Sequence, residues 1–267
     1  MAVKVAGLVT GRIVLITEYE GTRYCGFQLQ ANGPTIQGEI EEALRKLTGE
    51  KIRVMAASRT DAGVHARRQV VSFRTKSTLP LEAFVKGLNH YLPVDIAIKG
   101  ASRVADSFNV RRDAVSREYR YYLLNSPTRS PLKRGFVHLV GGLLDISAMN
   151  RACQLLIGRH DLASFVTGDE TGIKSTLRTL YQAEFTKDGD LVTFDVSADS
   201  FLPHQVRNMV GALIRVGRGK MSVDDFEDIV QSKTPGRAAP TAPAGGLFLT
   251  RVNYPGPFEG ETWGDIS

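Results

Sequence analysis

Residues 56–73, A-A-S-R-T-D-A-G-V-H-A-R-R-Q-V-V-S-F, join two apolar segments through a short polar loop. The segments at 51–57 and 69–74 are predicted to be strands, and Ala62–Gly63 favours a tight bend between them. Asp61 is the one acid of residues 59–76, which also hold five Lys or Arg side chains. The stretch therefore predicts a strand–loop–strand unit with a lone carboxylate among arginines.

Outward from this unit, the residue pattern predicts two series of elements in the same order. The first consists of strand 12–20, a helix capped by Thr35 and running to 47, strands 51–57 and 69–74, a helix from Pro80 to 90, and strand 94–104. The second consists of strand 116–125, a helix capped by Asp145 and running to 157, the hairpin 177–186 and 191–198, helices 203–216 and 223–231, and strand 246–252.

This repeated order favours an α+β fold. We expect two ferredoxin-like βαββαβ halves with mostly antiparallel sheets, joined around a central cleft. The predicted domains are residues 1–110, which carry the Asp61 loop, and residues 111–267.

Composition excludes several classes of protein. No apolar run approaches the ~18 residues of a membrane-spanning helix. Cys25 and Cys153 are the only cysteines and the histidines are scattered, so we expect no disulfide framework, no metal site and a cytoplasmic location. G-R-G-K-M-S at 217–222 lacks the phosphate-loop spacing and no dinucleotide fingerprint is present, so we expect no nucleotide cofactor and no other cofactor.

The positive charge is unevenly distributed. The net charge is +6, and residues 201–220 contain four Lys or Arg side chains and no acid. Such clusters suit a polyanionic partner such as a nucleic acid, although solvated surface faces would give the same pattern.

Asp61 can serve as a nucleophile or a general base when it is ionised, and a nearby arginine favours the ionised form. Taken from the loop alone, an aspartate that caps the turn or pairs with an arginine is the favoured interpretation.

The chain resembles the tRNA pseudouridine synthase A (TruA) family from about Ile13 to Pro255, and six ordered blocks carry the resemblance. They are E-Y-E-G-T-R-Y-C-G-F-Q-L-Q, T-I-Q-G-E-I-E-E-A-L, S-R-T-D-A-G-V-H-A, F-N-V-R-R-D-A-V-S-R-E-Y-R-Y, F-L-P-H-Q-V-R-N-M-V-G and A-G-G-L-F-L-T-R-V-N-Y-P. The block around Asp61 is the most specific of the six.

The resemblance implies an isomerase that converts uridine to pseudouridine in the anticodon arm of tRNA (tRNA positions 38–40). The ribose–nitrogen bond of uracil breaks, the base turns, and it rejoins the ribose through carbon. It also implies tRNA as partner, a homodimer, and no cofactor.

The resemblance also assigns roles to five residues. Asp61 would be the catalytic carboxylate, Arg207 its partner, and Tyr119 a catalytic and base-stacking residue. Arg59 would help displace the target base and Leu247 would line the base pocket. Without the resemblance, Tyr119 and Leu247 are most simply core residues, and Arg59 and Arg207 surface residues.

Some positions depart from the family pattern. Phe27 stands for the usual Trp, Arg68 for a frequent Gly, Val110 for Ala, and residues 202–205 (L-P-H-Q) for a more basic stretch, which affects the expected RNA contacts.

Two other functions stay open. One is a non-catalytic RNA-binding module on the same scaffold, and the other is an Asp-dependent nucleoside hydrolase that releases uracil. The combination of basic residues, an aromatic face and a carboxylate suits an enzyme that takes a base out of a helix.

Overall fold

The computed structural model describes residues 11–167, 175–238, 240–256 and 258. Within these residues the helices are α1 Ile36–Thr48, α2 Leu81–Tyr91, α3 Ile146–Gln154, α4 Gln205–Gly217 and α5 Val223–Ser232, with short 3₁₀ turns η1 Ala163–Phe165 and η2 Ala244–Gly246. The strands are β1 Gly11–Tyr19, β2 Met55–Ala56, β3 His65–Thr75, β4 Ile96–Val104, β5 Ser116–Leu124, β6 His138–Leu139, β7 Gly158–Asp161, β8 Leu177–Asp188, β9 Leu191–Ala198 and β10 Leu247–Asn253.

The ten strands form a single sheet in the order β4-β1-β3-β10-β5-β9-β8-β7, with β2 paired to β3 and β6 paired to β5. The β10–β3 and β5–β6 pairs are parallel and all other described pairs are antiparallel. The prediction of an α+β fold with a mostly antiparallel sheet is confirmed.

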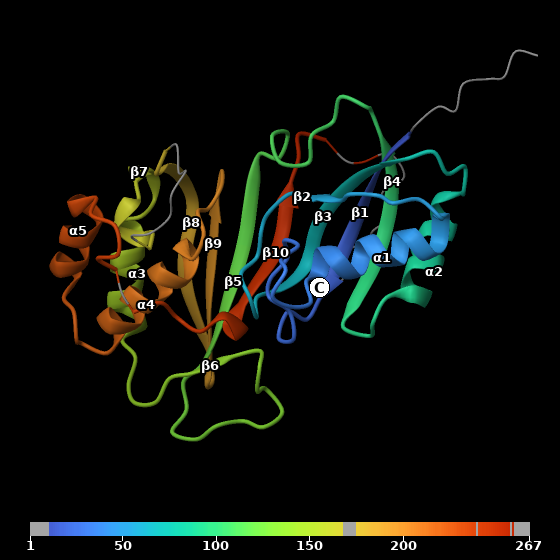
Figure 1. Cartoon of the computed structure of the whole chain (residues 1–267). Coiled ribbons are helices and arrows are strands. Elements are labelled where there is room, and N and C mark those ends of the chain that lie inside the picture. The colour runs from blue at the N-terminus through green and yellow to red at the C-terminus, as the bar shows by residue number, and fades with distance from the viewer. Residues whose placement is uncertain (1–10, 168–174, 239, 257, 259–267) are drawn as a thin grey trace, which may run out of the picture.

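The last strand, β10, joins the two halves of the sheet (Figure 1). It runs parallel to β3, with Phe248 opposite His65, and antiparallel to β5, with Leu249 opposite Tyr119. The βαββαβ order appears as β1-α1-β2-β3-α2-β4 and again as β5-α3-β8-β9-α4-β10. The division into domains 1–110 and 111–267 stays a prediction, because β10 belongs structurally to the seam.

Local chemistry explains why the elements begin and end where they do. The Thr35 side chain accepts a hydrogen bond from the Gly38 amide at the start of α1, and Gly49 ends that helix in a left-handed conformation. In β5, buried and half-buried residues alternate, so Arg117, Tyr119 and Tyr121 share the interior face.

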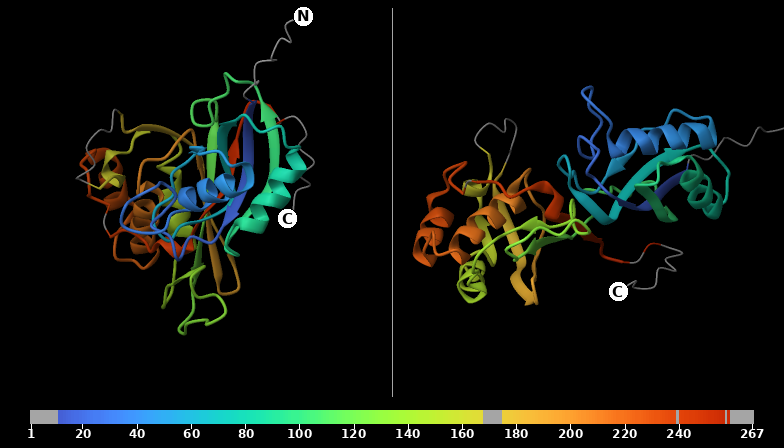
Figure 2. Two further views of the ribbon diagram at one scale, coloured as in Figure 1. Left: turned by 45° about the vertical axis from the view of Figure 1, so that its right-hand side comes forward. Right: turned by 90° about the horizontal axis from the view of Figure 1, so that it is seen from below.

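The helices cover one face of the sheet. Helices α1 and α2 lie against the β1–β3–β4 half of the sheet (Figures 1 and 2). In the other half, α3 packs against β8, and α4 and α5 pack against α3. The alternate side chains Glu18, Arg120, Asp195 and Thr250 line a broad groove on the other face. None of the described helices has both the length and the apolarity needed to cross a lipid bilayer.

The predicted boundaries around the opening stretch were wrong on both sides. Strand β2 covers only two residues instead of 51–57, and β3 begins at His65 instead of 69. Two pairings explain the longer strand: β10 pairs with its first residues, and β1 pairs with it through an irregular step in which Thr17 faces Gln69 but Tyr19 faces Ala66. The extra residue of β3 at this bulge changes which side chains face the helices.

The predicted helix 203–216 starts two residues later. His204 has a left-handed backbone with φ of 57°, which is not helical. It is therefore the N-cap residue, and α4 begins at Gln205. Strands β6 and β7 were not predicted, because each has too few residues for a recognisable alternation.

Candidate active site

The loop that carries Asp61 is anchored by side chains of the sheet. Gln69 of β3 donates Nε2–H to the Ser58 carbonyl at 2.8 Å and accepts the Ser58 amide through Oε1 at 3.3 Å. The Tyr19 hydroxyl lies 2.8 Å from Thr60 Oγ1. These buried contacts fix the backbone on the N-terminal side of Asp61.

A second loop packs against the first. The Phe27 amide donates to the Thr60 carbonyl at 3.0 Å. Gly26 has φ of 92°, and a Cβ there would lie 2.7 Å from the same carbonyl oxygen. Only glycine allows both the conformation and the close approach, which explains the G-F within the first family-like block.

Asp61 faces the first turn of α4. Its Oδ2 accepts a hydrogen bond from Arg207 Nη1 at 2.9 Å and lies 3.6 Å from His204 Nε2. The side chains of Asp61 and Arg207 are 20% and 17% exposed, so the pair is largely shielded from water yet open to a ligand. Charge-assisted hydrogen bonds of this kind are stronger than neutral ones.

Arg207 is itself held in place by the loop before β10. Its Nε–H donates to the Ala242 carbonyl at 2.8 Å. Gly211, one turn further along α4, lets this loop approach, because a Cβ at Gly211 would overlap the Pro240 carbonyl oxygen. The guanidinium thus has one nitrogen on backbone and another on the carboxylate.

Tyr119 closes the interior side of the site. It is 5% exposed, its hydroxyl lies 2.8 Å from Ser58 Oγ, and its ring meets Phe201 edge-on at 5.3 Å between centroids. Burial raises the pKa of Tyr119 to about 12, so the phenol keeps its proton at neutral pH.

A cavity of about 350 Å³ connects these groups. All five residues named from the sequence line it: Arg59, Asp61, Tyr119, Arg207 and Leu247. Leu247 is 5% exposed and Arg59 is exposed at the surface. The structure thus brings together residues up to 188 positions apart (247 minus 59) in one pocket.

Some arginines of the opening stretch lie elsewhere. Arg67 donates to the Tyr122 hydroxyl at 2.8 Å and lies over the rings of Tyr122 and Phe248, facing the open groove. Arg68 lines the same groove, and Arg74 lies 4.0 Å from Asp106. These side chains lie near Asp61 in the sequence, but the bulge and the alternation of β3 turn Arg67 and Arg68 to the groove.

Other site residues were missed from the sequence. His204 lies in the stretch that departs from the family pattern, and Ser58, Arg111 and Arg117 line the cavity without an assigned role. Since Arg117 and Tyr119 are two residues apart on a predicted strand, their shared face could have been inferred from the alternation.

Comparison with known proteins decides the family. A family model described as tRNA pseudouridine synthase matches residues 15–113 and 152–255. The chain belongs to the tRNA pseudouridine synthase family. A relative from Neisseria meningitidis serogroup C, described as tRNA pseudouridine synthase A, is 43% identical over 248 residues, which cover 91% of this chain and 92% of the relative.

Two further relatives with the same description agree. The protein of Pelobacter propionicus is 44% identical over 91% of this chain and 99% of its own length. The protein of Geobacter sp. is 42% identical over 91% of this chain and 98% of its own length. Membership of this synthase family makes the protein an isomerase that modifies RNA.

Proposed function

We propose that this protein isomerises uridine to pseudouridine in the anticodon arm of tRNA, with Asp61 as the catalytic carboxylate. The observation that carries the assignment is the 2.9 Å hydrogen bond between Asp61 and Arg207 inside a cavity that Tyr119 and Leu247 also line.

The cavity suits a base taken out of an RNA helix. Tyr119 and Leu247 offer ring and apolar surface to a flat base, and the carboxylate of Asp61 faces the same space. Arg59 is exposed at the rim of the cavity, where it can help separate the target base from its neighbours. Arginines along the rim attract the negatively charged backbone.

The reaction balances without any co-reactant. The bond from ribose C1′ to uracil N1 breaks, a bond from C1′ to C5 forms, C5 loses its proton and N1 gains one. Asp61 stabilises or captures the intermediate as a nucleophile or takes a proton as a base. Since burial keeps the Tyr119 hydroxyl protonated, Tyr119 assists this step by a hydrogen bond as a neutral phenol, and the C5 proton passes to an ionised base such as Asp61.

The partner is tRNA, in keeping with a net charge of +6. The active form is a homodimer, as in the family that the sequence resembles. It acts in the cytoplasm. Sedimentation equilibrium of the purified protein tests the dimer: a mass of about 29.2 kDa, that of one chain, would exclude it.

The test of activity is tritium release from tRNA labelled at uracil C5. Wild-type protein should release label, and Asp61→Ala should release none while retaining tRNA affinity. Asp188→Ala removes an exposed carboxylate at the end of β8 and serves as the matched control.

The products separate the alternatives. A non-catalytic RNA-binding module would bind tRNA but release no label in the wild type. A nucleoside hydrolase would produce free uracil and an abasic ribose. Either outcome would overturn the proposed reaction.

A further inference from the structure

The cavity around Asp61 is lined by more positive charge than one carboxylate balances. Its lining contains the four arginines Arg59, Arg111, Arg117 and Arg207 against the single acid Asp61. Arg207 is paired with Asp61 at 2.9 Å. The three remaining guanidinium groups have no carboxylate partner in the described part of the chain.

Arg117 lies at the bottom of this cluster and is 7% exposed. Its guanidinium donates only to backbone carbonyls, those of Ala57, Arg111, Ala114 and Asp199, at 3.3, 2.8, 3.2 and 2.7 Å. Carbonyl dipoles satisfy its hydrogen bonds, and the nearby Asp199 balances only part of its charge, since the effect of burial on its pKa outweighs that of Asp199. Burial is the first reason that the pKa of Arg117 lies below its ordinary value.

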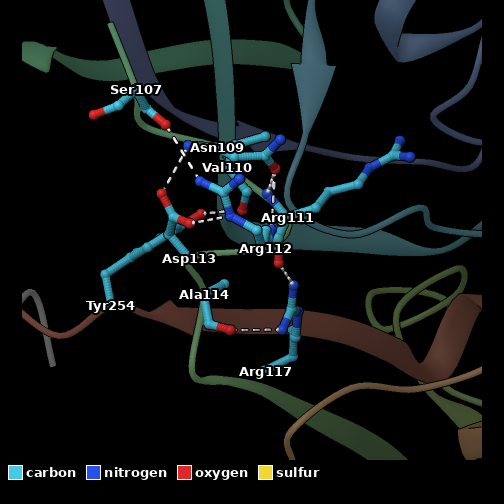
Figure 3. Close-up of polar contacts among 9 residues, drawn as sticks. All are labelled: Ser107, Asn109, Val110, Arg111, Arg112, Asp113, Ala114, Arg117 and Tyr254. Atoms are coloured by element: carbon cyan, nitrogen blue, oxygen red, sulfur yellow. Dashed lines mark hydrogen bonds and ion pairs between the residues drawn. The ribbon is translucent and has the colours of Figure 1, made fainter. Parts of the chain in front are cut away.

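Arg111 and Arg112 are neighbours in sequence with opposite surroundings. Arg112 donates Nε–H to Asp113 at 2.9 Å and contacts the Ser107 carbonyl, and Figure 3 shows the Arg111 side chain extending away from this pair. Arg111 donates Nε–H to the Ala56 carbonyl at 3.0 Å. Its two terminal nitrogens have no hydrogen-bond acceptor within the described residues, and the residue lines the cavity.

The guanidinium groups also repel one another. The pKa of Arg111 lies below its ordinary value, first because part of the side chain is withdrawn from water, and then because Arg59 and Arg117 are close. The fold holds this arrangement by backbone contacts to Ala56 and Ala57, which directly precede the Asp61 loop. An anion placed among these groups would remove the repulsion.

We propose that Arg111 and Arg59, with Arg117 behind them, form a binding site for one phosphate of the RNA backbone next to the target uridine. The proposal rests on the proposed function and divides the cavity into a nucleoside end at Asp61 and a phosphate end at Arg111. The ligand chemistry is a phosphate oxyanion, which arginine binds through paired N–H groups. Free inorganic phosphate would offer the same chemistry.

A set of anticodon stem-loop RNAs tests the site, each with one neutral methylphosphonate replacing a phosphate near the target uridine. Equilibrium Kd is measured for wild type, Arg111→Gln and Arg112→Gln. We expect Arg111→Gln to weaken binding of unmodified RNA about tenfold, as for one lost charge-assisted contact, and to lower the salt slope by about one. Arg112→Gln should change Kd less than about twofold, because its guanidinium is paired with Asp113.

One modified RNA should behave differently from the others. With the neutral linkage at the proposed position, wild type should bind about tenfold more weakly. Arg111→Gln should lose clearly less than wild type with this RNA, since only the contribution of Arg59 and Arg117 to that phosphate is left to lose. The proposal would be overturned if Arg111→Gln raised Kd by the same factor with every RNA in the set. It would also be overturned if no single neutral linkage changed the Kd of the wild type. The second measurement needs no variant and therefore holds even if Arg111→Gln misfolds.

A further arm separates a phosphate of the RNA backbone from free phosphate as the ligand of the site. Inorganic phosphate should compete with the unmodified RNA for wild type but much less for Arg111→Gln; competition by phosphate without any effect of a neutral linkage would assign the site to the free ion and overturn the RNA proposal. Because these readouts are affinities, they stand apart from tritium release, which alone decides the isomerase activity.

Discussion

Arg207 meets Asp61 through one hydrogen bond, from Nη1 to Oδ2, at 2.9 Å. The same guanidinium donates Nε–H to the Ala242 carbonyl at 2.8 Å. A planar fork that holds backbone with one nitrogen and the carboxylate with another fixes the direction of the Asp61 side chain. The pair therefore positions the reacting group as well as balancing its charge.

Replacing Arg207 should damage rate more than RNA affinity. Arg207→Lys keeps the charge but cannot make both contacts at once, so we expect the single-turnover rate to fall about tenfold, and about a hundredfold for Arg207→Ala. The Kd for tRNA should change less than about threefold, because the guanidinium faces Asp61. Lys220→Ala, an exposed cation after α4, is the control. A parallel loss of rate and affinity would make Arg207 an RNA contact instead.

Gln69→Glu tests how the Asp61 loop is held. The carboxylate keeps the shape of the amide but has no N–H for the Ser58 carbonyl, 2.8 Å from Nε2 in the wild type. We expect the free energy of unfolding to drop by about 1–3 kcal/mol and kcat to fall by at least about tenfold. Urea unfolding and tritium release measure the two effects.

The control for this variant is Gln182→Glu, at an exposed position on β8. It makes the same chemical change without touching the loop, so both quantities should stay near wild type. Full activity of a folded Gln69→Glu protein would show that the loop does not need this anchor.

Tyr119→Phe separates the ring from the hydroxyl. If the phenol assists proton removal from uracil C5, its loss should lower kcat about a hundredfold. Ser58→Ala removes only the neighbour at 2.8 Å and should cost less than about tenfold. Because the pKa of Tyr119 is raised to about 12, the wild-type rate should show no break from this group between about pH 7 and 10. A Phe variant as active as wild type would leave the ring with a stacking role only.

Alkaline conditions should destabilise the fold. Burial raises the pKa of Tyr19, Tyr119 and Tyr121 above the ordinary 10.0. Below about pH 10 these tyrosines are protonated in both the folded and the unfolded chain, so the stability of the fold does not depend on their ionisation. Above about pH 10 the tyrosines of the unfolded chain lose protons that those of the folded chain retain. The free energy of unfolding should therefore fall as pH rises, by up to about 1.4 kcal/mol per pH unit for each buried tyrosine.

Urea titrations at about pH 8, 10 and 11 measure this dependence. Tyr121→Phe removes one contributing group, whose hydroxyl donates to the Pro243 carbonyl at 2.7 Å, and should flatten the decline. A free energy of unfolding that stays level between pH 10 and 11 would contradict the burial argument.

Elements defined by local sequence patterns were predicted better than boundaries that depend on pairing with distant strands. The helix from Thr35 and the hairpin 177–198 follow from local caps and alternation, and both are present. The start of β3 at His65 was missed because its pairing partner, β10, lies about 180 residues later and leaves no local signal.

In the site, too, residues within recognisable motifs were predicted, whereas features set by the local backbone conformation were missed. Asp61 and Arg207 were named through family-like motifs, and the structure places them 2.9 Å apart. His204 was overlooked because its left-handed backbone, which turns the ring toward Asp61, has no signature in L-P-H-Q. Arg67 and Arg68 lie close to Asp61 in the sequence but face the open groove, because a one-residue bulge reverses the facing of the side chains, and alternation does not reveal such a bulge.

The position of β10 between the two halves of the sheet has a consequence for folding during synthesis on the ribosome. Leu247 of this strand completes the cavity, and the strand's neighbours are β3 and β5, made from 182 to 131 residues earlier (247 minus 65, and 247 minus 116). A nascent chain that has emerged only as far as α5 holds Asp61, Tyr119 and Arg207 but has nothing between β3 and β5. We therefore expect the cavity to form only after β10 has been made, and pairing between segments so distant in sequence favours slow folding.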